Sequence, residues 1–278
     1  MFTGLELLIL ASVLPCSNHS HVAAAQKWDG LKVTWGPTLD PPFFDSMPRT
    51  ESEAKRMGFK KIGSCNPQAK WRGSRYVKDD DYAVTLLYDV AGHIAGIQTS
   101  VPKHLPNGFP WKEIQPPFIE DGRRFVSTVY FVNPAIICKR GRSRAQFQNE
   151  GTGTVLYIQN SSVPEDSVRV PDREVDIQGT EWTKGMCFPR RMGQHYSYRT
   201  SLNMKCEELF PMCVIYNKGQ LNAFGWALQN DLPSPRYEHP VQATFALFMN
   251  PVPKCLYSAG TLSIFHVFMT SDVSANTC

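Results

Sequence analysis

Short apolar stretches separated by turn-forming residues run through most of the chain. Residues 82–88 (YAVTLLY) and 93–101 (HIAGIQTSV) are rich in β-branched and aromatic side chains, and the segment Asp-Val-Ala-Gly lies between them. Two such stretches joined by turn formers are typical of a β-hairpin. The pattern therefore predicts antiparallel strands over this part of the chain.

The same order of features returns later in the sequence. Residues 213–228 contain an apolar run that ends in tyrosine, the turn formers Asn-Lys-Gly, and a return strand that contains glycine. Each hairpin is followed by a proline-rich stretch with a histidine, His104 or His239, and then by a strongly apolar strand, at 125–132 or 262–269. This order predicts two related lobes, while the alternative is that hairpins recur in β proteins for generic reasons.

Helical signals are few and short. Thr50 and Glu53 form an S/T-x-x-E capping box, and Gly58 stands where a C-terminal cap belongs. Residues 203–210 form a second candidate helix that Pro211 would stop. We expect a mainly β, antiparallel and sandwich-like fold with few short helices, built as two related lobes or as one elongated sandwich.

The N-terminus predicts export from the cell. Residues 5–14 are an apolar run of the length found in signal peptides, and small residues with an A-x-A pattern follow at 23–25. We therefore expect a signal peptide over residues 1–25 and a secreted, extracellular chain. The apolar run is well short of the roughly 20 residues that cross a bilayer, and no later run is longer, so no membrane span is predicted.

A polar, proline-containing stretch divides the remaining chain. The expected organisation is an N-terminal β lobe over 26–160, a polar connecting segment over 161–183 and a C-terminal β lobe over 184–278. The chain of 278 residues is 42% hydrophobic and has a formal charge of +4, which is too small to indicate a dedicated nucleic-acid binder.

The cysteines predict a disulfide framework. The chain has eight cysteines, of which Cys16 lies in the predicted signal peptide, and no CxxC pair that would indicate a metal-thiolate site. Cys213 lies within a predicted strand and is expected to be a buried free thiol. Terminal Cys278 pairs within the chain or links two chains, and both alternatives stay open. The disulfide candidates are Cys65, Cys138, Cys187, Cys206, Cys255 and Cys278.

The histidines are candidate metal ligands. His266 is flanked by large apolar side chains, and burial favours the neutral imidazole that binds zinc or copper. The predicted metal set is His195, His239 and His266, with Glu238 or Met192 as a fourth or outer ligand. Such a site would be an oxygen-activating copper centre or a hydrolytic zinc centre. The alternative is that each histidine bonds a backbone carbonyl in the core or lies on the surface.

Other enzyme signatures are absent from the sequence, which has no G-x-S-x-G elbow, no phosphate-binding glycine loop with its lysine and no H-E-x-x-H. A glycosidase-like pair of carboxylates brought together by folding stays open. Asn160 begins an N-x-S sequon and is the predicted glycan attachment site. A basic run suits sulfated glycans or other anionic surfaces, or is a solvated loop or a processing site: Lys139, Arg140, Arg142 and Arg144.

Three segments, CFPRRMGQHYSY, YNKGQLNAFGWAL and PRYEHP, resemble a group of secreted arthropod proteins of unassigned function. The resemblance extends over most of the mature chain. It implies secretion and a disulfide-stabilised fold, and it transfers no catalytic residue. We expect a secreted glycoprotein that acts in extracellular recognition or structural interaction, with an extracellular protein or an anionic glycan as partner. The alternative is a secreted copper- or zinc-dependent enzyme that uses the histidine cluster.

Overall fold

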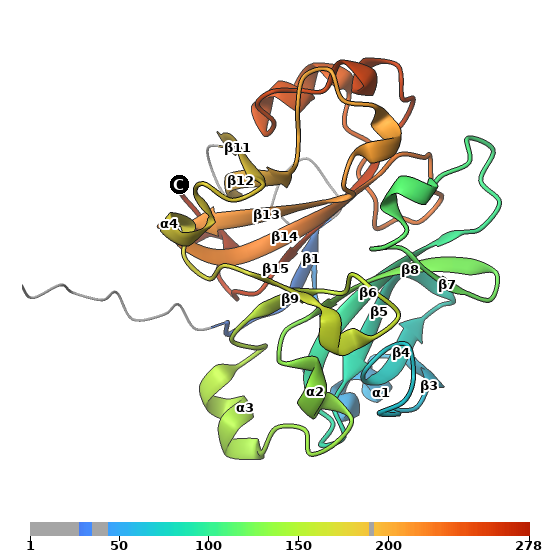
Figure 1. Cartoon of the computed structure of the whole chain (residues 1–278). Helices are drawn as coiled ribbons and strands as arrows, with labels where there is room; N and C mark the ends of the chain where they lie inside the picture. Colours follow the sequence, from blue (N-terminus) through green and yellow to red (C-terminus); the bar gives the residue numbers. More distant parts are fainter. Residues whose placement is uncertain (1–27, 35–43, 189–191) are drawn as a thin grey trace, which may run out of the picture.

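Two antiparallel sheets packed face to face make up the fold (Figure 1). The computed structural model describes residues 28–34, 44–188 and 192–278. The predicted signal peptide, residues 1–25, lies outside the described residues. The mainly β, antiparallel and sandwich-like fold predicted from the sequence is confirmed.

The N-terminal sheet has the order β10-β9-β8-β6-β5-β4-β3, and β7 also pairs with β8. Its strands are β3 (Lys60–Gly63), β4 (Ser74–Lys78), β5 (Asp81–Tyr88), β6 (Ile94–Pro102), β7 (Ile119–Asp121), β8 (Arg124–Tyr130), β9 (Leu156–Ile158) and β10 (Val168–Val170). The C-terminal sheet has the order β11-β12-β13-β14-β15-β1-β2. Its strands are β1 (Lys32–Thr34), β2 (Phe44–Ser46), β11 (Trp182–Phe188), β12 (Gly193–Tyr198), β13 (Met212–Asn217), β14 (Gln220–Leu228) and β15 (Ser263–Phe268).

The helices are short, as expected. The α-helices are α1 (Glu51–Arg56), α2 (Pro134–Ile137), α3 (Arg144–Glu150) and α4 (Glu174–Ile177). The 3-10 helices are η1 (Lys112–Ile114), η2 (Pro164–Asp166), η3 (Cys206–Glu208), η4 (Gln242–Leu247), η5 (Lys254–Tyr257) and η6 (Val273–Ala275). The capping box of Thr50 and Glu53 is present at α1, and the helix predicted over 203–210 is the single turn η3.

The two sheets repeat one arrangement. In each, the second strand of a hairpin, β6 or β14, pairs with a strand that comes later in the sequence, β8 or β15. The register of the hairpin shifts immediately before Tyr88 in the first sheet and immediately before Tyr216 in the second. Each of these tyrosines donates its hydroxyl to a proline carbonyl, at 2.8 Å for Pro48 and 2.6 Å for Pro171.

A second tyrosine extends the correspondence. Tyr76 on β4 packs edge-on against Tyr88 with ring centroids 5.4 Å apart, and Tyr196 on β12 packs in the same way against Tyr216 at 5.5 Å. Each hydroxyl also donates to the glutamate that begins a short helix, Glu51 of α1 or Glu174 of α4. Shared registers and shared side-chain contacts show that the two sheets are structural repeats.

Each sheet is extended at one edge by a further pair of strands. The pair β1 and β2, from the start of the chain, extends the C-terminal sheet beyond β15, and the pair β9 and β10 extends the N-terminal sheet beyond β8. The C-terminal sheet therefore includes β1 and β2, which come from the predicted N-terminal lobe, 26–160. The predicted connecting segment, 161–183, contains β10 and α4 and is part of this framework.

The largest apolar core fills the space between the sheets. Trp226 is fully buried there and donates its indole N–H to Ser127 Oγ of the opposite sheet at 3.0 Å. Alternation along the strands places one set of side chains in this core and the next set on the outer face of each sheet. The inward-facing set includes Tyr76, Leu86, Ile97, Val129, Val214, Phe224, Phe265 and Val267.

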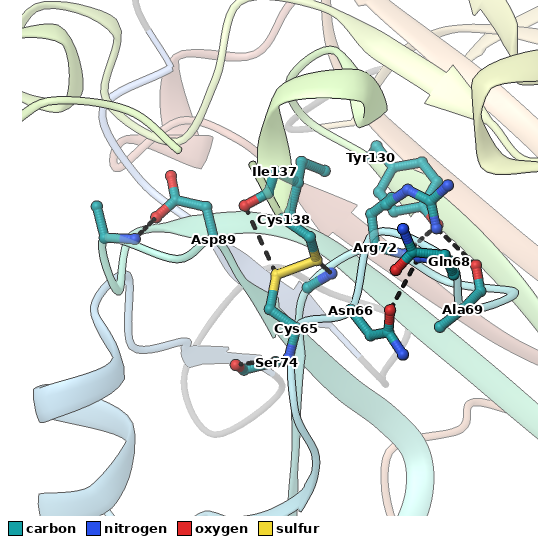
Figure 2. The surroundings of a disulfide bond; sticks show 12 residues. Cys65, Asn66, Gln68, Ala69, Arg72, Ser74, Asp89, Tyr130, Ile137 and Cys138 are labelled. Atoms are coloured by element: carbon teal, nitrogen blue, oxygen red, sulfur yellow. Dashed lines mark hydrogen bonds between the residues drawn. A yellow bond between two sulfur atoms is a disulfide. The ribbon is translucent and has the colours of Figure 1, made fainter. Parts of the chain in front are cut away.

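Disulfides join segments that are distant in sequence, and the predicted set of paired cysteines is confirmed. The pairs are Cys65–Cys138, Cys187–Cys278 and Cys206–Cys255. Figure 2 shows the first pair, which ties the segment after β3 to the end of α2. Cys278 pairs within the chain, so the alternative in which it links two chains is wrong. Among the described residues, no helix has the length and apolar character needed to cross a bilayer.

Candidate functional site

A cavity of about 440 Å³ lies on the outer face of the C-terminal sheet. Its floor is formed by β12 to β15, and its walls come from the segments around η3, η4 and η5, which lie over this sheet in Figure 1. Most of the lining side chains are apolar. They include Phe188, Met192, Leu209, Phe210, Ala227, Leu247, Phe248, Met249, Leu256, Leu262 and Ile264.

A row of paired residues crosses the floor of the cavity. Ser197 pairs with Cys213, Cys213 with Gly225, and Gly225 with His266, so the four positions lie side by side on β12 to β15. A Cβ atom added at Gly225 would lie 3.2 Å from the sulfur of Cys213 and 2.9 Å from Cδ2 of His266. The glycine therefore leaves the space in which these two side chains approach each other across the strand between them.

His195 completes a cluster with this row. It lies on β12 two residues before Ser197, on the same outer face, and it is almost fully buried. One ligand atom each of His195, Cys213 and His266 lies within 4.8 Å of the others. The two imidazole rings stand nearly perpendicular, with centroids 6.0 Å apart. Strands that are separated in the sequence thus bring two nitrogen donors and one sulfur donor to one place.

The cluster is uncharged at neutral pH. Burial lowers the pKa of His195 to about 4, against the opposing effect of the carbonyls of Gly193 and Met186. Burial, together with the neighbouring His195, lowers the pKa of His266 to about 3. Burial also raises the pKa of the Cys213 thiol to about 12. Neutral imidazoles carry free nitrogen lone pairs, which is the form that accepts a hydrogen bond or binds a metal.

Glu238 lies beside the cluster. Its backbone forms a two-way hydrogen-bonded bridge with Ile264, at 2.9 Å in each direction, which holds the segment against β15. This position brings its Oε1 to 3.5 Å from Nδ1 of His266. Burial of the carboxyl group raises the pKa of Glu238 to about 8.

The structure brings together part of the metal set predicted from the sequence. His195 and His266 converge, Glu238 adjoins His266, and Met192 lines the same cavity. His239 also lines the cavity, but its Nδ1 lies 3.0 Å from the carbonyl oxygen of Leu262, and it is not one of the three clustered residues.

Cys213 was missed as a member of the set. Its contact with the histidines depends on the registers of β13, β14 and β15, which the local sequence does not specify. The available signal was Gly225, an isolated glycine inside a strand pattern, which often marks a close approach of other groups.

The N-terminal sheet carries a different set of side chains at the equivalent positions. Its row passes through Thr85, Gln98 and Thr128, and Arg75 stands where the other sheet has His195. Gln98 accepts a hydrogen bond from Arg75 Nε at 3.0 Å and donates one to Thr128 Oγ1 at 2.9 Å. One repeat thus fills the position with a hydrogen-bonded network, and the other places Gly225 there under a cavity.

Only part of the predicted basic run lies on the surface of the structure. Arg142 has 1% of its surface exposed and donates to the carbonyls of Gly151, at 3.0 Å, and Ile94. Its Nε also lies 3.8 Å from the buried carboxylate of Asp89. Arg142 is therefore a core residue, and its predicted role in binding an anionic surface is wrong. The remaining members of the run are exposed: Lys139, Arg140 and Arg144.

The predicted glycan site has the exposure that glycosylation needs. Asn160 is exposed and follows β9 by two residues. Its attachment of a glycan remains a prediction.

Comparison of the chain with protein-family models, with curated proteins and with solved structures found no match.

Proposed function

We propose that this chain is a secreted, disulfide-stabilised glycoprotein that recognises a small, mainly apolar molecule in the cavity of the C-terminal sheet. The size and lining of the cavity carry this proposal. Its volume of about 440 Å³ lies in the range of roughly 300 to 1,000 Å³ found for small-molecule sites. Such sites are lined mostly by apolar side chains and contain a few polar groups that orient the ligand.

The polar groups of the cavity define the ligand further. His195 and His266 present neutral imidazoles, each with one donor and one acceptor nitrogen. A ligand with one hydroxyl group on an apolar body would donate that hydroxyl to Nε2 of His195 and bury the rest among residues such as Phe248 and Ile264. A strongly charged ligand would lose its hydration without a charged partner among these imidazoles.

Three features support an extracellular setting. The disulfides within the chain are typical of oxidising compartments. The sequon at Asn160 is exposed, and the first residues have the pattern of a signal peptide. The resemblance to secreted arthropod proteins points in the same direction.

A fluorescence titration with the uncharged probe N-phenyl-1-naphthylamine tests the proposal. Ala227 lines the cavity, and the variant Ala227→Phe would place a phenyl ring inside it. We expect saturable binding to the mature wild-type chain and a loss of affinity of about tenfold or more in the variant.

Val175→Phe is the matched control, because Val175 is 61% exposed on α4 and does not line the cavity. Its affinity for the probe should equal that of the wild type, and circular dichroism should show the same fold for all three proteins. Equal binding by a folded Ala227→Phe variant would place the probe elsewhere and would refute this function.

A further inference from the structure

We propose that His195, Cys213 and His266 form a binding site for a zinc or copper ion in the floor of the cavity. This inference goes beyond the proposed recognition of an apolar molecule and does not depend on it. The three ligand atoms already lie within 4.8 Å of one another, on strands whose registers are fixed by the sheet.

The donor set selects the kind of ion. Two imidazole nitrogens and one cysteine sulfur are soft to borderline ligands, which favour zinc and copper over the hard cations magnesium and calcium. Three protein ligands also leave a coordination position for water or another small group. Because all three residues line the cavity, this position is accessible from it.

The geometry requires only a small adjustment. Bonds of about 2.0 Å to nitrogen and about 2.3 Å to sulfur in a tetrahedral arrangement place the ligand atoms about 3.3 to 3.6 Å apart. The ligand atoms now lie within 4.8 Å of one another, so they have to approach by about 1 Å on metal binding. Rotation of the side chains supplies this movement. Gly225 leaves the path between Cys213 and His266 open, whereas Gln98 blocks it in the other sheet.

Polar groups lie behind both imidazoles. Nδ1 of His195 lies 3.1 Å from the carbonyl oxygen of Gly193, and an N–H donated there leaves Nε2 with its lone pair. Nδ1 of His266 lies 3.5 Å from Glu238 Oε1. A carbonyl or carboxylate behind a metal-binding histidine is the usual arrangement that fixes the tautomer and the ring. The carbonyl of Gly193 therefore positions His195, and Glu238 adjoins His266.

This set differs from the one predicted from the sequence by one member. Cys213 takes the place of His239, whose ring nitrogen instead contacts a backbone carbonyl oxygen. The difference makes the proposal testable, since a variant of Cys213 should weaken metal binding and a variant of His239 should leave it unchanged.

The experiment uses the mature chain, produced without a histidine tag and freed of metal with a chelator. It is titrated with Zn²⁺ in one arm and with Cu⁺ under anaerobic, reducing conditions in the other. Bound metal is measured by elemental analysis after gel filtration. We expect about one equivalent of at least one of the two ions. X-ray absorption of the loaded protein should show one sulfur at about 2.3 Å and nitrogen at about 2.0 Å.

Variants identify the ligands. Cys213→Ser should lower the affinity by about tenfold or more, and His239→Gln should leave it unchanged. Loss of binding in His239→Gln with retention in Cys213→Ser would overturn the ligand set. Absence of bound metal from the folded wild type in both arms would overturn the site, whatever the result with the apolar probe. If Cys213→Ser does not fold, the presence or absence of sulfur in the wild-type X-ray absorption spectrum decides.

Discussion

Gly225→Ala is the substitution that most directly tests the packing of the cavity floor. Its new methyl group would lie 2.9 Å from Cδ2 of His266, 3.1 Å from the carbonyl oxygen of Phe265 and 3.2 Å from the sulfur of Cys213. The first distance is shorter than van der Waals contact allows, and Gly225 pairs on both sides within the sheet, so His266 has to move.

Overpacking of this kind typically lowers the free energy of unfolding by about 1 to 3 kcal/mol. For a chain of this size each kcal/mol corresponds to about 2 to 4 °C in Tm. We therefore expect Tm to fall by about 2 to 12 °C. The displaced imidazole should also weaken zinc binding. Removing the sulfur relieves one contact, so the double variant with Cys213→Ala should lose less stability than the sum of the single variants.

Urea unfolding followed by circular dichroism measures these effects, because a shift in midpoint at constant slope reports a change in stability. Gly63→Ala is the control. Gly63 also lies in a strand, but its added Cβ would come no closer than 3.5 Å to Arg75, so its effect should stay within about 0.5 kcal/mol. Stability and zinc affinity equal to the wild type in Gly225→Ala would refute the packing described for this row.

Three further sets of substitutions have predicted effects on stability. Arg142→Met should lower the free energy of unfolding by about 3 to 5 kcal/mol, because it leaves the carboxylate of Asp89 buried without its cation, whereas Arg140→Met should change it by less than about 0.5 kcal/mol. The pKa of Glu238 is about 8 in the folded chain and near 4.5 when unfolded. The contribution of this carboxyl to the free energy of unfolding is therefore fully present below pH 4.5 and is lost progressively as the pH rises to about 8. Metal-free Glu238→Gln should therefore gain roughly 3 to 4 kcal/mol relative to the wild type between pH 5 and pH 8. Replacing both Cys206 and Cys255 by alanine opens a loop of 49 residues, which should cost about 4 kcal/mol and weaken probe binding because the bridge joins two walls of the cavity.

Chemical denaturation at the stated pH values measures all three effects. Equal stability losses in the two arginine variants would contradict the core position of Arg142. A stability difference between Glu238→Gln and wild type that does not vary with pH would contradict the burial of that carboxyl. Unchanged probe affinity in the double cysteine variant would show that the bridge does not support the cavity.

Local patterns in the sequence predicted the hairpins, because alternation and turn residues act over a few positions. The strands expected at 82–101, 213–228 and 262–269 correspond to strands of the structure. The disulfide-forming cysteines followed from the predicted secretion, their odd number in the mature chain and the absence of a CxxC pair, and Cys213 was set apart because it lies within a strand.

Contacts between distant segments were not predictable in the same way. The pairing of β1 with β15 joins opposite ends of the chain, and no local signal specifies it. Arg142 lies in a basic run whose composition indicates a surface, yet partners from three other segments hold it in the core. The approach of Cys213 to His266 depends on the registers of β13, β14 and β15 together, which explains why the metal set predicted from the sequence leaves out Cys213.

A crystal structure of the mature chain grown with N-phenyl-1-naphthylamine would test the central claim most directly. The account predicts electron density for the probe in the cavity of the C-terminal sheet, in contact with Leu209, Phe248 and Ile264. Density confined to other surfaces, or a cavity closed by the segment between β14 and β15, would contradict it.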